Sequence, residues 1–359
     1  MPFFIILLWL VRLSHGWYMD VSCYEKHHHP EHVLSWMKGA FDLIDVAFVA
    51  TSELNEAIRQ RTAFTDLTPV HRAQHRALHQ LLSGATTSAK NIYRMTLNTA
   101  TQWEKVRTKF EVMQKYKDSA HGEPQDLGLP ADHDGTHRYQ LLTNKDVVVY
   151  CDLGRFMYGY QCLTWLPNPG WACDVSVMID FPVDRAFTQC MDPSASDIKE
   201  SVWAQPSSID GIPLQIQICE RFFTDQIQNR AAEFKKLQVF DDVSRAISAY
   251  QDLNGPPVQR WQRDNLDRPP IDMALQGDTT MLHALLTALP DGANAVNVEG
   301  DELRGWGNAI RLSKEEPRKA IDNASNYVFF ALACRMALPE IKFRISDQGK
   351  FVRSLYRSR

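Results

Sequence analysis

The chain has 359 residues, of which 44% are hydrophobic and 23% are charged, and its formal net charge is −4. This composition is that of a folded globular protein and excludes a disordered or fibrous one, and the length supports one large domain or two smaller ones. A slightly acidic balance gives no reason to expect nucleic-acid binding through the overall surface charge.

An unbroken apolar run opens the chain, from Phe3 to Val11, and small residues follow at Ser14 and Gly16. A short apolar run before small residues is typical of a secretory signal peptide, and we predict one over residues 1–16. The run is shorter than the roughly 20 residues that a membrane-spanning helix needs. We therefore predict a secreted protein without a membrane span, with an uncleaved anchor or a buried first strand as the alternatives.

Seven cysteines follow the predicted cleavage site, and five of them lie between Cys151 and Cys219. Cysteines in an oxidising compartment usually pair, so we predict disulfides in this region. The odd number leaves at least one thiol free or in an intermolecular bond. No pair has the C-x-x-C spacing of cysteine zinc sites.

The first long segment after the signal peptide, from residue 31 to about 117, is predicted to be helical. Its apolar residues recur at three- and four-residue steps, and glycine and proline are scarce. A loop rich in glycine, proline and acidic residues follows over 122–135. We therefore expect a helical N-terminal region over residues 17–138.

Three short strands are predicted in the middle of the chain. Residues 145–151 contain a run of β-branched side chains, residues 176–180 are a second short strand, and residues 214–219 alternate as a strand with one buried face does. Pro167 to Gly170 has the composition of a turn between the first two. The three strands are expected to form a small antiparallel sheet.

Helical periodicity returns at 279–289 and 316–338, after a long connection over 251–272. The elements together predict an α+β fold that is mainly helical. The extreme C-terminus, residues 341–359, is rich in lysine and arginine. We expect it to be a solvated basic tail, with a patch that binds anionic surfaces as the alternative.

The helix predicted from residue 279 carries one metal-ligand side chain, His283. A zinc protease places H-E-x-x-H on such a helix, because two histidines one turn apart hold the metal and the glutamate polarises a bound water. Here the glutamate position is Ala284 and the second histidine position is Thr287. A lone histidine on an apolar helix is more often a buried structural residue than a ligand.

Two later segments, taken together with this helix, form a longer sequence pattern. Residues 300–307 read Gly-Asp-Glu-Leu-Arg-Gly-Trp-Gly, and residues 320–331 contain Asn323-Ala324, Tyr327 and Phe330-Ala331. Their order and spacing resemble the deuterolysin and lysine-specific metalloendopeptidase group, the aspzincins, with the pattern L-H-E-x-x-H, G-T-x-D-x-x-Y-G and N-A-D-x-Y-x-x-F-A. Ser325 replaces the aspartate of the last motif, and residues 219–223 resemble the cysteine and paired aromatics that precede the zinc helix.

The resemblance implies a metalloendopeptidase-like domain over residues 139–340 with a zincin-like helix pair. It places His283 on the first zinc ligand, Ala284 on the general base and Thr287 on the second ligand. The catalytic base and one ligand are thus replaced by residues that cannot perform their roles.

The third ligand position of the group, an aspartate, falls on Leu303. Asp301 and Glu302 stand beside it and are possible substitute ligands. Since such zinc sites need three protein ligands, His283 alone is a vestigial ligand that would not hold the metal tightly.

We therefore predict a metalloendopeptidase-like protein that is proteolytically inactive and binds a protein, a peptide or a metal, with zinc possible but no cofactor required. The alternative is an active or weak zinc metalloendopeptidase with a rearranged site of His283 and Glu302 or Asp301. A structural protein with an accidental likeness is the third possibility.

Other polar clusters and one sequon give weaker signals. His27–His29 with His32 form a histidine-rich tract that would bind a metal weakly, with a dedicated zinc or copper site as the alternative. His71, His75 and His79 share one helix face, for which we favour a solvated face over a metal site. For the polar cluster at residues 132–137 we favour turn chemistry. Asn323-Ala324-Ser325 is a sequon for N-glycosylation, inside a motif that is expected to pack inward.

Overall fold

The computed structural model describes residues 16–24, 30–60, 62, 64–82, 97–117, 146–162, 164–175, 177–183, 187–188, 190, 202–205, 212–223, 269, 271–272, 275, 277–288 and 305–353. The chain divides into two compact units, each built from two separate stretches. Unit 1 comprises residues 1–33 and 114–225, and unit 2 comprises residues 34–113 and 226–359. The predicted boundary near residue 138 lies outside the described residues.

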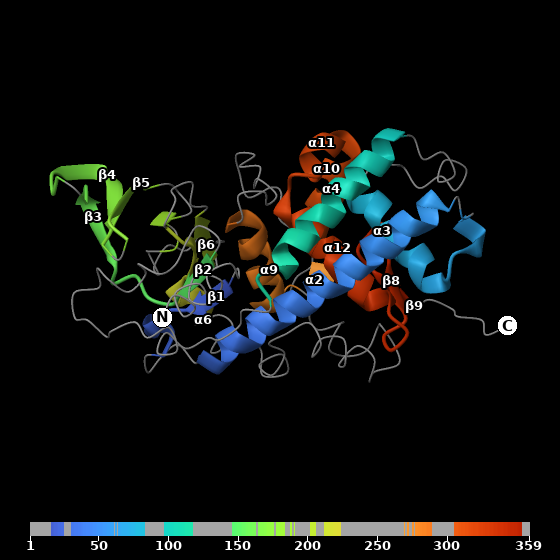
Figure 1. The fold of residues 1–359 in the computed structure, drawn as a ribbon, viewed down its shortest axis with the longest axis horizontal. Helices are drawn as coiled ribbons and strands as arrows, with labels where there is room; N and C mark the ends of the chain where they lie inside the picture. The colour runs from blue at the N-terminus through green and yellow to red at the C-terminus, as the bar shows by residue number, and fades with distance from the viewer. Residues whose placement is uncertain are drawn as a thin grey trace, which may run out of the picture. The chain divides into compact units, whose positions relative to one another are not determined.

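Unit 1 contains a four-stranded sheet with the order β1-β2-β7-β6 (Figure 1). β1 (Gly16–Met19) and β7 (Leu214–Ile218) each run parallel to β2 (Asp146–Tyr150), and β6 (Val202–Gln205) runs antiparallel to β7. A short 3-10 helix, η2 (Val21–Tyr24), follows β1, and α6 (Glu220–Phe223) follows β7. The apolar run before β1 lies outside the described residues.

A second sheet of unit 1 is antiparallel and has the order β3-β4-β5. Its strands are β3 (Phe156–Tyr160), β4 (Pro167–Asp174) and β5 (Ile179–Pro182). The turn predicted at 167–170 is wrong, because these residues begin β4. Prolines are tolerated here since β5 pairs with β4 only from Trp171 onward, and the register against β3 shifts between Tyr158 and Tyr160.

The core of unit 1 is aromatic and is cross-linked by disulfides. Phe156, Phe181 and Phe187 meet edge to face, with ring centroids 4.9–5.4 Å apart. The disulfides join Cys23 to Cys151, Cys162 to Cys173 and Cys190 to Cys219. The prediction that disulfides stabilise this region is confirmed, and they fit an oxidising environment.

β7 differs from its predicted pattern, because both of its faces are buried. Gln215 and Gln217 are 5% and 0% exposed. Their amides bond to Asp174 and to the Tyr150 and Ile218 carbonyls. Alternating polarity therefore marks a buried polar layer in β7 and not a solvated face.

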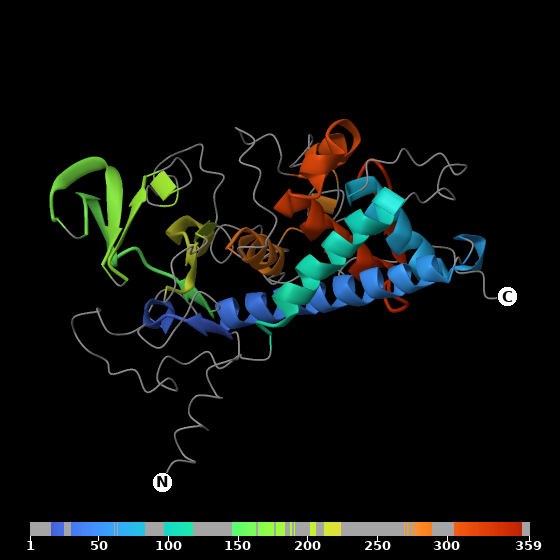
Figure 2. The same ribbon diagram turned by 45° about the horizontal axis from the view of Figure 1, so that its top comes forward.

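Unit 2 is helical (Figures 1 and 2). Its described helices are α2 (Pro30–Arg59, whose first turn belongs to unit 1), η3 (Phe64–Asp66), α3 (Pro69–Leu82), α4 (Leu97–Gln114), α9 (Gly277–Ala288), α10 (Trp306–Glu315), α11 (Pro317–Ala320) and α12 (Ala324–Ala337). α12 packs against α3, α9 and α10 and is buried on nearly all sides, so it forms the centre of this unit. The predicted α+β, mainly helical fold is confirmed, but the three predicted strands do not form one antiparallel sheet, because β2 and β7 pair in parallel and β5 belongs to the other sheet.

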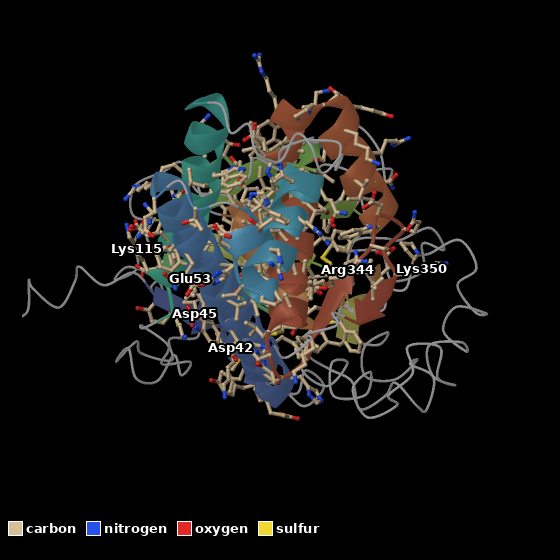
Figure 3. The ribbon with its side chains drawn as sticks, turned by 90° about the vertical axis from the view of Figure 1, so that its right-hand side faces the viewer. Asp42, Asp45, Glu53, Lys115, Arg344 and Lys350 are labelled. Carbon is tan, nitrogen blue, oxygen red and sulfur yellow. A yellow bond between two sulfur atoms is a disulfide. The ribbon has the colours of Figure 1, made fainter. Side chains whose placement is uncertain are left out.

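The basic C-terminal segment is not a solvated tail over its described part. β8 (Phe343–Ile345) and β9 (Phe351–Arg353) form a hairpin, and Phe343, Ile345 and Phe351 are buried. Gly349 turns the hairpin at φ 71°, where a Cβ would lie 2.6 Å from the Cβ of Pro269. The buried aromatic and aliphatic side chains alternate with the half-buried Arg344 and Val352, so one face of the hairpin packs inward; Arg344 and Lys350 are labelled in Figure 3. Residues 354–359 lie outside the described residues.

Candidate functional site

The helix that carries His283 is held tightly at its first turn. Gly277 lies against Trp36 of α2, and a Cβ at this position would overlap the indole ring. Gly39 likewise faces Asp278, with a virtual Cβ 2.7 Å from the aspartate Cβ. The two glycines allow α2 and α9 to approach closely, and this fixes the direction in which α9 presents its faces.

His283 lies on the less buried face of α9, together with Thr280 and Thr287. The hydroxyl of Thr287 donates a hydrogen bond to the carbonyl of His283 at 2.9 Å. Ala284 is 3% exposed and faces the core. The positions assigned to the second ligand and the base therefore hold a hydroxyl bonded to the helix backbone and a buried methyl group.

The proposed substitute ligands Asp301 and Glu302, and Leu303 beside them, lie outside the described residues. The description resumes at Gly305, which precedes α10 at φ 91°. Asp272 accepts a hydrogen bond from the backbone N–H of Trp306 at 3.0 Å, so a carboxylate from elsewhere in the chain satisfies the start of α10. The described end of this motif therefore begins a helix.

The last motif of the resemblance forms a buried network of hydrogen bonds. Asn326 is fully buried and donates hydrogen bonds to the carbonyls of Leu81 and Ala309. Asn323 donates to the side-chain oxygen of Asn326 at 2.6 Å, and Tyr327 donates to the Ile321 carbonyl at 2.7 Å. The motif thus joins α12 to α3 and α10, which gives its residues a structural role.

The sequon at Asn323 is part of this hydrogen-bond network. Asn323 is 5% exposed and its amide nitrogen is engaged with Asn326. A buried nitrogen leaves no space for a glycan, so this folded arrangement does not fit modification at Asn323.

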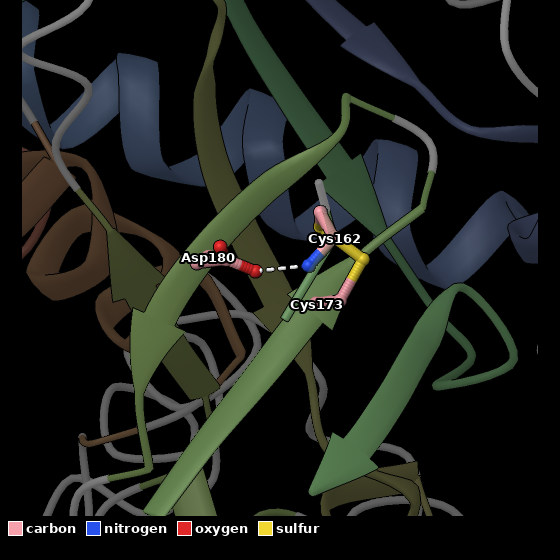
Figure 4. Close-up of side chains that lie close together, drawn as sticks. All are labelled: Cys162, Cys173 and Asp180. Carbon is pink, nitrogen blue, oxygen red and sulfur yellow. Dashed lines mark hydrogen bonds between the residues drawn. A yellow bond between two sulfur atoms is a disulfide. The ribbon is translucent and has the colours of Figure 1, made fainter. Parts of the chain in front are cut away.

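One group in the described part of the chain brings three potential metal-ligand atoms together: Cys162, Cys173 and Asp180, within 4.8 Å of one another. Figure 4 shows that the two sulfurs are bonded to each other and that Asp180 accepts the backbone N–H of Cys162. Metals bind thiolates, which a disulfide does not offer. In its oxidised form this group therefore stabilises the β3–β4 connection.

The solvated face predicted for the three histidines of α3 is wrong for two of them. His75 and His79 are 4% and 6% exposed, and both rings lie 5.2 Å from that of Trp103 in α4. His71 remains outside this cluster and bonds to Glu53. The sequence of α3 alone does not show that Trp103 of α4 covers these two histidines, so their burial could not be predicted from it.

Burial keeps the two enclosed imidazoles neutral. It lowers the pKa of His75 from 6.5 to about 3, with further lowering by the charges of His79 and Arg76. It lowers the pKa of His79 to about 4. Among the described residues, the Nδ1 atom of His75 has no hydrogen-bond partner.

We expect acid to destabilise unit 2 through this pair. Below pH 6.5 the unfolded chain binds protons that the folded chain excludes, so the free energy of unfolding falls as the pH drops from 6.5 toward the folded pKa values. The slope is about 1.4 kcal/mol per pH unit for each histidine. Denaturant titrations across this range measure it, and the His75→Leu/His79→Leu variant should lose it; an unchanged slope in that variant would contradict this assignment.

Cys334 is the unpaired cysteine among the described residues, and it lies buried in α12. Burial raises the pKa of its thiol well above the usual value, so the thiol stays protonated. The clusters at 27–29 and 132–137 lie outside the described residues. In the described part of the chain no helix is long and apolar enough to span a bilayer.

No family model, curated protein or solved structure matches this chain. The likeness to the aspzincin group therefore rests on the motifs quoted above, and the roles that it implies stay predictions.

Proposed function

We propose that the chain is a secreted, metalloendopeptidase-like protein that acts by binding a protein or peptide partner and does not hydrolyse peptides. The observation that carries the proposal is the set of side chains around His283 on α9. Secretion is supported by the N-terminal apolar run and by disulfides confined to unit 1 among the described residues.

Peptide hydrolysis by a zinc site requires three protein ligands and a base that accepts a proton from the bound water. On α9 the base position, Ala284, is buried, so a glutamate there would need space that the core does not supply. Thr287 bonds to the helix backbone. The only ligand type left on this helix face is the imidazole of His283.

Metal content and cleavage of peptide libraries test this proposal. The purified chain, incubated with zinc and then desalted, should retain no stoichiometric metal and show no cleavage that a chelator abolishes. His283→Ala should change neither result. Stoichiometric zinc that is lost together with activity in His283→Ala would instead establish the rearranged active site with Asp301 or Glu302.

A gain-of-ligand variant provides the positive control. Thr287→His places a second imidazole one helical turn from His283 on the less buried face of α9. Two imidazoles at this spacing chelate zinc, so this variant should take up more metal than the unmodified chain. Uptake by the variant alone shows that the assay detects zinc on α9 and that the natural chain lacks the second ligand.

A further inference from the structure

Exposed apolar side chains are concentrated on the antiparallel sheet of unit 1. Of the large apolar residues that are exposed in the described part of the chain, most come from this sheet and its connections: Met157, Tyr158, Tyr160, Trp165, Leu166 and Met178. Leu166 is 60% exposed and Trp165 is 51% exposed, and both lie in the connection between β3 and β4. We call Tyr158, Tyr160, Trp165 and Leu166 the hairpin tip.

The hairpin tip is uncharged over a long stretch. From Phe156 to Cys173 the sequence contains no Asp, Glu, Lys, Arg or His. Tyr158 adds no charge at neutral pH, since a tyrosine hydroxyl is protonated there even at its usual pKa of 10.0 and burial raises the pKa of Tyr158 further, to about 12. In both views the β3–β4 hairpin lies on the side of unit 1 away from the four-stranded sheet (Figures 1 and 2).

The tip is held in one conformation. Trp165 has φ 54°, a region that bulky residues rarely adopt. Its backbone N–H donates to the Gln161 carbonyl at 2.9 Å, and Gln161 donates back to the Leu166 carbonyl at 3.2 Å. The Cys162–Cys173 disulfide closes the same connection. The turn thus fixes the backbone from which the exposed indole projects, at the cost of an unfavourable φ.

The chemistry of the hairpin tip indicates which of three ligands, a sugar, a protein or a lipid bilayer, it fits. A sugar site needs free polar groups beside its aromatic rings, but Thr164 bonds to Gln161 and to the Leu166 N–H within the turn. A stable protein complex buries roughly 800 Å² on each partner, which is more than the four side chains of the hairpin tip supply by themselves. A bilayer surface adapts to a small projecting tip and requires no matching shape.

We infer that the hairpin tip inserts into the headgroup region of a zwitterionic lipid bilayer. Trp165 and Leu166 enter the boundary with the acyl chains, and the tyrosines lie at headgroup level, where aromatic side chains with a polar end are stable. The uncharged tip matches a membrane without net charge. This inference does not depend on the proposed function and holds whether or not His283 binds zinc.

Sedimentation of the full-length protein with phosphatidylcholine vesicles tests the inference. The variant Trp165→Gly/Leu166→Ser removes both side chains, and glycine fits the positive φ, so the turn should remain folded. We expect its partition into vesicles to be weaker by roughly tenfold or more. Val49→Ser is the matched control, because Val49 in α2 is 51% exposed, like Trp165, and its loss should leave binding unchanged. Leu166→Ser alone, which keeps the Trp165 backbone untouched, should give a smaller loss.

Salt and lipid charge separate this mode of binding from electrostatic adsorption. Partition through the hairpin tip should be the same at about 0.5 M salt as at low salt, and should not require phosphatidylserine. Binding that needs anionic lipid and disappears in salt would overturn the inference and point to basic residues. Absence of binding to neutral vesicles, or equal binding by the double variant, would also overturn it.

Discussion

Asn326→Ala is expected to destabilise unit 2 by about 3 kcal/mol or more. The side chain of Asn326 is fully buried and links three helices through its amide. It donates to the carbonyls of Leu81 in α3 and Ala309 in α10, and its oxygen accepts the amide of Asn323. Alanine would leave the Leu81 carbonyl near the end of α3 and the Asn323 amide without this partner, and each such group carries a desolvation cost of about 1–3 kcal/mol.

Hydrogen exchange is the suitable measurement, because two units need not unfold in one step. Protection of amides in α3, α10 and α12 should fall together in Asn326→Ala. Asn55→Ala is the control, since Asn55 lies in the same unit and bonds to Glu104 in a half-buried pair. It should cost less than about 1 kcal/mol. If the two variants prove equally stable, the buried hydrogen-bond network of Asn326 does not hold these helices together.

The elements with one dominant periodicity could be predicted from the sequence. β2 and α9 match their predicted segments closely, because β-branched runs and helical spacing are local properties. The predicted helix over 316–338 is instead divided at residues 321–323. Elements whose partner lies far along the chain were missed, among them β1, which pairs in parallel with a strand about 130 residues later.

From the sequence alone we could predict which catalytic and ligand side chains the candidate site lacks, but not how the remaining side chains are arranged. The chemical types at Ala284 and Thr287 are visible in the sequence, and the structure adds where their side chains lie. The burial of His75 and His79 was not visible, because it depends on Trp103 in a separate helix. Polar residues on an amphipathic pattern indicate solvent only when no second element covers them.

A buried ion pair in the antiparallel sheet of unit 1 is likewise not visible in the sequence pattern. Arg155, immediately before β3, donates from Nε to Asp174 at the end of β4 at 3.0 Å, and the two side chains are 8% and 1% exposed. Asp174 also accepts from Gln215 at 3.0 Å. Arg155 donates to Gln217 and lies over the ring of Tyr150, with Cζ 3.5 Å from its centroid. The alternating glutamines of β7 therefore face this ion pair.

Arg155→Met is expected to destabilise unit 1 by about 3–5 kcal/mol, because it leaves the Asp174 carboxylate buried without its cation. Asp174→Asn should cost a similar amount through the orphaned guanidinium. The double variant should be less destabilised than the sum of the two, since it removes both charges. Hydrogen exchange in β2, β4 and β7 measures each free energy. Additive losses would contradict a direct coupling, and the glutamines of β7 would then be the main support of the contact between the sheets.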